Sequence, residues 1–298
     1  MEAMVRKSSN GVRGKLKRLL FLVFFPAIYL RRIYLHRFGK SYDKFYNSLF
    51  NMVQSGSAVV AIPDFQGLFE IDFRSHILKC ALMNKQFEPE LVELVRTYVD
   101  AEKDALDIGA NIGLYAVLFS KIIHKSNRVL AIEPAPLALE YLRRNIHRNG
   151  CTQSVIIFEG IATDATGIFR MNVIPGMEEY SSVGEIVHPS VHNKSSEIIE
   201  VRGDTIDNLV NAFNLRPGFI KIDVEGAEYL VLNGAIETIQ RYHPVILSEL
   251  SDKMLLSCGA NSEMVMRLVQ NNDYRIMPLG GGFLAIPNAG NKTGWQDG

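Results

Sequence analysis

The stretch LDIGANIG, residues 106–113, places an acid, two glycines and an asparagine in one turn between two apolar runs. The run at 104–109 has the length and composition of a buried strand, and the run at 112–124 has its apolar residues at helical spacing. A glycine-rich turn between a strand and a helix serves either a tight connection or the close approach of a nucleotide. The turn alone leaves both interpretations open.

From this turn onward, apolar runs of strand length alternate with longer stretches of helical period. The alternation is typical of a mostly parallel sheet with helices on both faces, an α/β fold. Three glycines at 280–282 join the last two runs and predict an antiparallel C-terminal hairpin. The predicted strands are 104–109, 128–134, 154–160, 167–173, 197–204, 218–224, 244–250, 274–279 and 282–287, and the predicted helices are 112–124, 136–150, 205–210, 227–242 and 262–272.

Three regions follow from this pattern. Residues 1–40 form a basic and apolar arm, residues 41–103 hold accessory elements, and residues 104–298 form the main domain. A strand at 67–73 and a helix at 89–99 are expected among the accessory elements, covering one end of the sheet.

The neutral total charge hides an uneven distribution. The first 40 residues contain ten basic residues and one acid, which leaves 22 basic and 31 acidic residues in the rest. An acidic body argues against nucleic acid as a partner. The apolar stretch from Leu19 to Leu30 is interrupted by Pro26 and is shorter than the ~20 residues of a spanning helix. Flanked by basic residues, it predicts peripheral contact with an anionic membrane; the alternative is packing on the protein's own body or on a second subunit.

Cys80, Cys151 and Cys258 are far apart and lack metal-binding spacing. Neither a disulfide framework nor a zinc site is indicated, and no metal site is predicted. We therefore expect a reducing, cytoplasmic location, with the arm at the inner face of a membrane if it binds lipid.

Residues in the turn and at the end of the next strand together indicate which ligand the turn could bind. Gly109 and Gly113 permit a tight turn, Asn111 is expected to cap the following helix, and Asp107 is placed to face a cationic group. Glu133 ends the second strand, where a carboxylate can accept hydrogen bonds from both ribose hydroxyls. The G-x-G spacing of dinucleotide sites is missing, so the turn suits a nucleoside without phosphates. S-adenosyl-L-methionine meets that description.

Acids also end the later strands. Asp223 and Glu225 follow the fourth strand, and Glu249 ends the fifth. A carboxylate there can act as a general base or orient a hydroxyl, and we take Asp223 as the first candidate, with Glu225 and Glu249 behind it. Glu228 falls in the first turn of the next helix, where complementing the helix terminus is the simpler role.

Six segments carry a resemblance: ALDIGANIGLYAV, AIEPAP, LRRNI, GDTIDNL, IKIDVEGAEYLVLNGA and PVILSEL. In this order and spacing they resemble the FkbM family of S-adenosylmethionine-dependent methyltransferases, over about residues 65–287. The resemblance implies the class I methyltransferase fold, which is Rossmann-like with a seven-stranded sheet and a reversed last strand. It implies methyl transfer usually to oxygen, often on a sugar or a secondary metabolite.

By motif position, the resemblance assigns cofactor contacts to Asp107, Gly109, Ala110, Asn111, Gly113 and Glu133. Related methyltransferases often have an acid facing adenine after the third strand, whereas this chain has Ile161 near that place. Adenine contact through Ile161, Ala162 or Asp164 is left open.

We therefore expect O-methylation of a sugar, glycan or secondary-metabolite hydroxyl, with the polar segment 175–196 as a candidate substrate loop or lid. One alternative is a nicotinamide-dependent oxidoreductase, which the missing G-x-G and the DVEGAE block oppose. Another is a non-catalytic, membrane-associated protein on a methyltransferase scaffold, which the full set of strand-end acids opposes.

Overall fold

The structure is a computed structural model that describes residues 56–84, 86–174, 181–182 and 196–288. The expectations for the arm at 1–40 lie outside these residues. So do those for most of the segment 175–196. No helix in the described part of the chain has the length and hydropathy needed to cross a bilayer.

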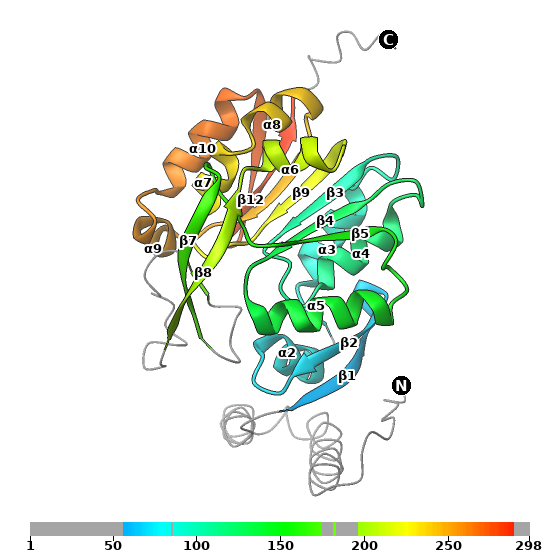
Figure 1. Ribbon diagram of the computed structural model, residues 1–298. Helices are drawn as coiled ribbons and strands as arrows, with labels where there is room; N and C mark the ends of the chain where they lie inside the picture. The colour runs from blue at the N-terminus through cyan, green and yellow to red at the C-terminus, as the bar shows by residue number, and fades with distance from the viewer. Residues whose placement is uncertain (1–55, 85, 175–180, 183–195, 289–298) are drawn as a thin grey trace, which may run out of the picture.

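Seven strands form the central sheet, in the order β11-β12-β10-β9-β3-β4-β5 (Figure 1). Five neighbouring strands are parallel: β3 (Asp104–Ile108), β4 (Val129–Glu133), β5 (Val155–Glu159), β9 (Pro217–Ile222) and β10 (Val245–Glu249). The last strand, β12 (Gly282–Pro287), runs antiparallel to both β10 and β11 (Tyr274–Leu279). The expected mostly parallel sheet with an antiparallel C-terminal hairpin is confirmed.

Helices cover both faces of this sheet, because successive side chains of a strand point to opposite faces. On β3, Ala105 packs into the core beneath α4 (Leu114–Ile122) and α5 (Pro136–Arg148). Leu106 and Ile108 pack into the opposite core. That second core is covered by α6 (Ile206–Ala212), α7 (Glu228–Asn233), α8 (Ile236–Tyr242), α9 (Asp252–Ser257) and α10 (Ser262–Asn271).

The prediction of one continuous helix at 227–242 is wrong, because this range contains two helices, α7 and α8. The chain bends at Gly234, where a Cβ would lie 2.1 Å from the carbonyl oxygen of Thr163. This close backbone contact comes from a distant segment, so helical periodicity does not reveal it. The short helices α2 (His76–Asn84) and α9 and the strand β1 (Ser57–Ile62) were not predicted either.

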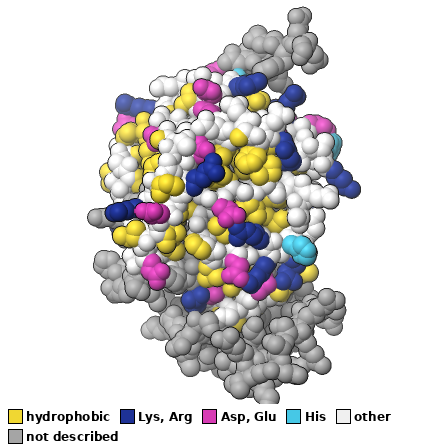
Figure 2. Space-filling view, viewed as in Figure 1, with side chains coloured by type: hydrophobic (Ala, Val, Ile, Leu, Met, Phe, Trp, Pro, Cys, Tyr) yellow, Lys and Arg dark blue, Asp and Glu magenta, His cyan; other side chains and the backbone are white. Residues whose placement is uncertain are grey.

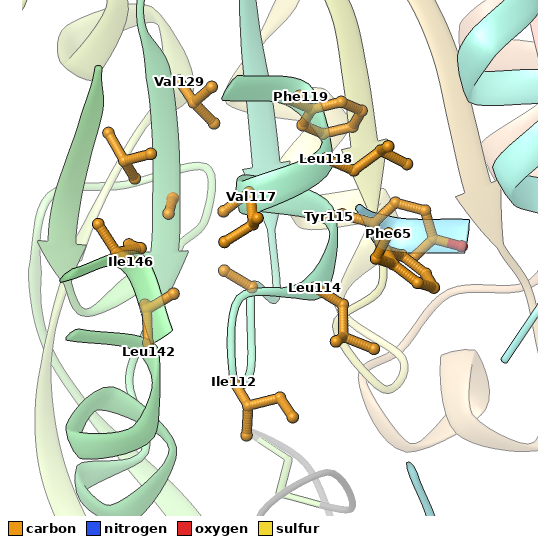
Figure 3. Packing of buried hydrophobic residues seen from close by; sticks show 14 of the residues in the cluster. Phe65, Ile112, Leu114, Tyr115, Val117, Leu118, Phe119, Val129, Leu142 and Ile146 are labelled. Atoms are coloured by element: carbon orange, nitrogen blue, oxygen red, sulfur yellow. The ribbon is translucent and has the colours of Figure 1, made fainter. Parts of the chain in front are cut away.

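The accessory elements are a hairpin of β1 and β2 (Gly67–Asp72), a short 3-10 helix at Pro63–Phe65, and helices α2 and α3 (Pro89–Tyr98). Their aromatic side chains continue the core beneath α4. The fully buried Phe65 meets Tyr115 edge to face, with ring centroids 5.0 Å apart (Figure 3). The accessory elements therefore share a core with the central sheet and fix the position of α4.

A second sheet of three strands has the order β6-β8-β7. Its strands are β6 (Ile161–Ala162), β7 (Gly167–Val173) and β8 (Glu197–Asp204). It places Ile161 and Ala162 just after β5, beside the carboxyl end of β4. On the molecular face shown in Figure 2, basic and acidic side chains are interspersed. Arg148 lies 2.9 Å from Glu70 of β2.

Candidate active site

A cavity of about 210 Å³ lies at the carboxyl ends of the parallel strands. Its wall brings together most of the predicted site residues, namely Gly109, Ala110, Asn111, Glu133, Ile161, Ala162, Asp223, Glu225 and Glu249. Asp107 and Gly113 lie behind the wall. The strands that carry these residues meet at one edge because they are parallel, which is where α/β sheets bind ligands.

Two glycines shape the turn after β3. Gly109 has φ 81°, and a Cβ there would lie 1.8 Å from the carbonyl oxygen of Asp223. Gly113 has φ 88°, and its Cβ would lie 2.6 Å from a methyl carbon of Leu142. The left-handed backbone and the close neighbours both require glycine, so the turn passes directly against the end of β9.

The prediction that Asn111 caps α4 is wrong. The N-cap position is Gly113, and no side chain caps this helix. Asn111 instead adopts φ 48°, a left-handed conformation that asparagine tolerates better than most residues. Its backbone N–H donates to Glu133 Oε2 at 2.7 Å. The N–H groups of Gly109 and Ala110 both donate to the carbonyl oxygen of Ile132.

Glu133 is held at the rim of the cavity by the backbone. Its Oε1 accepts from Ala135 N–H at 2.8 Å and its Oε2 from Asn111 N–H at 2.7 Å. An ionised carboxylate oxygen can accept more than one hydrogen bond. The backbone contacts therefore fix the orientation of the carboxylate at a place where the hydroxyls of a ligand can reach it.

Asp107 is only 1% exposed, and its carboxylate has no side-chain hydrogen-bond partner among the described residues. Burial raises the pKa of Asp107 to about 6, although the nearby Lys221 ammonium opposes this shift. The two residues lie opposite each other on β3 and β9. Asp107 is thus a buried acid directly behind the turn, and the Lys221 ammonium is its main opposite charge.

Lys221 was not predicted as a site residue. Its side chain is 4% exposed, and its Nζ lies 3.0 Å from Asp223 Oδ2. The signal was present in the sequence, because a lysine inside the apolar strand IKIDV needs a buried partner. The acid two residues later, on the same side of the strand, provides one.

Asp223 and Glu249 end neighbouring strands and both line the cavity. The charge of Asp223, followed by burial, raises the pKa of Glu249 to about 7. Two carboxylates this close disfavour simultaneous ionisation. Glu249 can therefore carry a proton near neutral pH.

Glu225 has φ 53° and lines the cavity, whereas Glu228 lies in the first turn of α7 and is only 3% exposed. Glu228 accepts a hydrogen bond from Gly226 N–H at 3.2 Å. Burial raises the pKa of Glu228 to about 7. Glu228 therefore supports the turn beneath the acids, at the helix terminus, without lining the cavity.

The accessory elements supply a second group that sequence reasoning missed. Glu88 precedes α3 with φ 47° and accepts a hydrogen bond from the hydroxyl of Tyr115 at 2.7 Å. Burial raises the pKa of Glu88. His76, Ile77 and Phe87 line the cavity on the same side. The glutamate lies outside every strand-end motif, so only the packing of α3 against α4 brings it to the site.

The strand order, the reversed β12 and the cavity at the strand ends define the class I methyltransferase fold. The family model described as the methyltransferase FkbM domain matches residues 107–276, more than half of the chain. The chain belongs to this family, which confirms the resemblance.

A curated relative, methyltransferase sdnD of Sordaria araneosa, is 26% identical over 156 residues. The match covers 44% of this chain and 60% of the relative. Among solved structures, the FkbM methyltransferase of Methylobacillus flagellatus is 19% identical with a TM-score of 0.43, covering 70% of this chain and 52% of that one. A putative caffeoyl-CoA O-methyltransferase of Staphylococcus aureus is 13% identical with a TM-score of 0.45, covering 71% and 90%.

Proposed function

We propose that this protein is an S-adenosylmethionine-dependent methyltransferase that methylates a hydroxyl group of a sugar, glycan or secondary metabolite. One observation supports the proposal: a single cavity is lined both by the turn after β3 with Glu133 and by the acids Asp223 and Glu249. The first group suits the cofactor, and the second suits proton removal from an acceptor.

The residues on the cofactor side fit S-adenosylmethionine chemically. Glu133 presents an oriented carboxylate to ribose hydroxyls, and Ile161 and Ala162 offer an apolar surface for adenine. Gly109 lets the backbone pass close to the ligand. Asp107 is a buried acid behind this turn, and a cationic amino-acid end nearby would favour its ionised form.

When bound, S-adenosylmethionine supplies an activated methyl group, so the chain's own residues have to align the acceptor and remove one proton. Asp223 lines the cavity, where a hydroxyl can donate to its carboxylate. The neighbouring Glu249, with its raised pKa, can donate to a second acceptor oxygen. A polyhydroxylated acceptor suits this pair of groups.

The acceptor role of Asp223 is tested with Asp223→Asn. We expect turnover to fall about a hundredfold or more while affinity for S-adenosylhomocysteine changes little, because the amide cannot take the proton. Turnover is measured with tritium-labelled S-adenosylmethionine and a panel of hexoses and their methyl glycosides. Asp100→Asn, on an exposed loop, is the control. Equal losses of turnover and affinity would instead assign Asp223 to the cofactor, and no labelled sugar with wild type would exclude these acceptors.

The ribose role of Glu133 is tested by calorimetry with S-adenosylhomocysteine. Glu133→Gln should weaken binding about tenfold or more, since the amide loses an acceptor and a charge. Glu159→Gln is a matched control, because Glu159 pairs with Glu133 in register on the next strand but is more exposed. Unchanged affinity in Glu133→Gln would remove this residue from the ribose site.

A further inference from the structure

Lys221 occupies an unusual position for a lysine. It lies on β9 between two strands of the central sheet, with its side chain 4% exposed. Phe219, two residues earlier, packs into the core beneath α4, so Lys221 points to this same face. An ammonium buried there without compensation would be strongly disfavoured, so its neighbours have to hold it.

Carboxylates and an aromatic ring surround the ammonium. Its Nζ lies 3.0 Å from Asp223 Oδ2 and 4.7 Å from the centroid of the Tyr115 ring. The Tyr115 hydroxyl donates to Glu88, so the ring is held in place from its other end. Asp107 faces Lys221 from the neighbouring strand.

The charges around Lys221 are strongly unbalanced. Burial disfavours its ammonium, but the surrounding carboxylates outweigh burial and raise the pKa of Lys221 above its ordinary value. These carboxylates are Asp223, Asp107, Glu88 and Glu249. Lys221 is the only lysine or arginine in the cavity wall among the described residues.

One cation therefore lies among four carboxylates, and among the described residues it forms a direct ion pair with only one of them. The direct contact is to Asp223, whereas the pKa of Glu249 is raised to about 7. Removing the ammonium would leave Asp223 beside Glu249, Asp107 and Glu88 with no opposing charge. Without the ammonium, protonation of the Asp223 carboxylate would become more favourable.

We propose that Lys221 is a positioning residue that holds the Asp223 carboxylate at the cavity and keeps it ionised for proton removal. This inference rests on the proposed function, in which Asp223 accepts the proton. Tyr115 and Glu88 extend the arrangement from α4 to the start of α3.

The test titrates the Asp223 side chain by carbon-13 NMR, in protein labelled at the aspartate carboxyl carbon. The Asp223→Asn spectrum identifies the resonance. In Lys221→Met, which keeps the length of the side chain and removes its charge, we expect the resonance to change to the neutral form about one pH unit or more higher than in wild type. Lys221→Arg should stay within about half a unit of wild type, and Lys121→Met, on the exposed end of α4, should match it.

An unchanged titration of Asp223 in Lys221→Met overturns the proposal, whatever the loss of stability. If that variant does not fold, the double variant Lys221→Met with Asp107→Asn replaces it, because one buried charge of each sign is removed. A purely structural role would lower the melting temperature and leave the titration unmoved. With an acceptor in hand, the acidic limb of the kcat/KM profile should move in the same direction.

The proposed function can fail independently of this inference. Wild-type protein that binds no S-adenosylhomocysteine in calorimetry would contradict the function, and the titration of Asp223 would still report on Lys221. Cofactor binding that stays within about threefold in Lys221→Met would place the effect on Asp223 and not on the nucleoside turn.

Discussion

At the scale of single residues, the site depends on groups that have no freedom to move. Gly109 is confined by the carbonyl oxygen of Asp223, and Glu133 is confined by two backbone N–H groups. These constraints orient the acids before any ligand binds, which lowers the entropic cost of aligning reactants. A substitution at either position should therefore act on geometry as well as on charge.

Gly109→Ala tests this confinement. The new Cβ would lie 1.8 Å from Asp223 O at φ 81°, so backbone strain and a clash with β9 both arise. Gly150 is a matched control, since it has φ 71° and a Cβ there would have no neighbour within 4 Å. In urea unfolding, Gly150→Ala should cost about 1–2 kcal/mol, and Gly109→Ala clearly more. Similar costs for both would show that the turn can relax away from β9.

The sequence predicted the strand-end acids because their position follows from the sheet alone. Asp223, Glu249 and Glu133 each lie at the end of a parallel strand, so one topological rule brings them together. No such rule predicts the position of Glu88, because that position depends on how α3 packs. Asn111 was predicted to cap a helix because of its residue type, but it adopts a left-handed conformation within the turn instead.

At the scale of elements, the accessory hairpin is tied through α5 to the turn after β3. The fully buried Asn145 accepts from Glu70 N–H at 2.7 Å and donates to the carbonyl oxygens of Glu70 and Ile112, at 3.1 and 2.9 Å. One side chain thus joins β2, α5 and the turn after β3. Figure 3 shows Ile112 near the apolar side chains of α5, Leu142 and Ile146. Helical spacing places Asn145 on the buried face of α5 with Leu142 and Ile146, but it does not reveal which backbone groups Asn145 bonds.

Asn145→Leu should lower the free energy of unfolding by about 3 kcal/mol, because one buried and two partly buried backbone hydrogen bonds are lost. Asn149 offers a matched comparison: it bonds the N–H and carbonyl of Leu68 in the same way, at 2.9 Å each, but is less buried. Water can replace its bonds, so Asn149→Leu should cost less. Asn145→Leu should also weaken S-adenosylhomocysteine binding, through Ile112. Denaturant unfolding and calorimetry check both, and equal effects of the two variants would contradict the link.

At the scale of the whole molecule, the buried acids make stability depend on pH. The pKa is raised to about 6 for Asp107 and to about 7 for both Glu228 and Glu249. An acid with a raised pKa binds more protons in the folded state than in the unfolded state. Its contribution therefore decreases as pH rises from about 4 to about 7, and then levels off. The protein holds this unfavourable charge at the place where a cationic ligand is proposed to bind.

We expect the free energy of unfolding without ligand to be lower at pH 7.5 than at pH 5.5. Glu228→Gln should reduce this difference, since the neutral amide does not lose a proton when pH rises. Glu237→Gln, in the first turn of α8, is the control. Urea unfolding across this pH range measures the effect. A difference that is the same in Glu228→Gln and wild type would show that Glu228 does not contribute.

The place of β12 has a consequence for how the chain acquires its site during synthesis. Among the described strands β12 is made last, yet it lies between β10 and β11 in the sheet. Gly282 pairs with Glu249, and a Cβ there would lie 2.1 Å from Ser248 O. On the ribosome, the edge of β10 thus stays open until residues 282–287 have emerged. A nascent chain then exposes an unpaired strand beside its acids until the hairpin inserts.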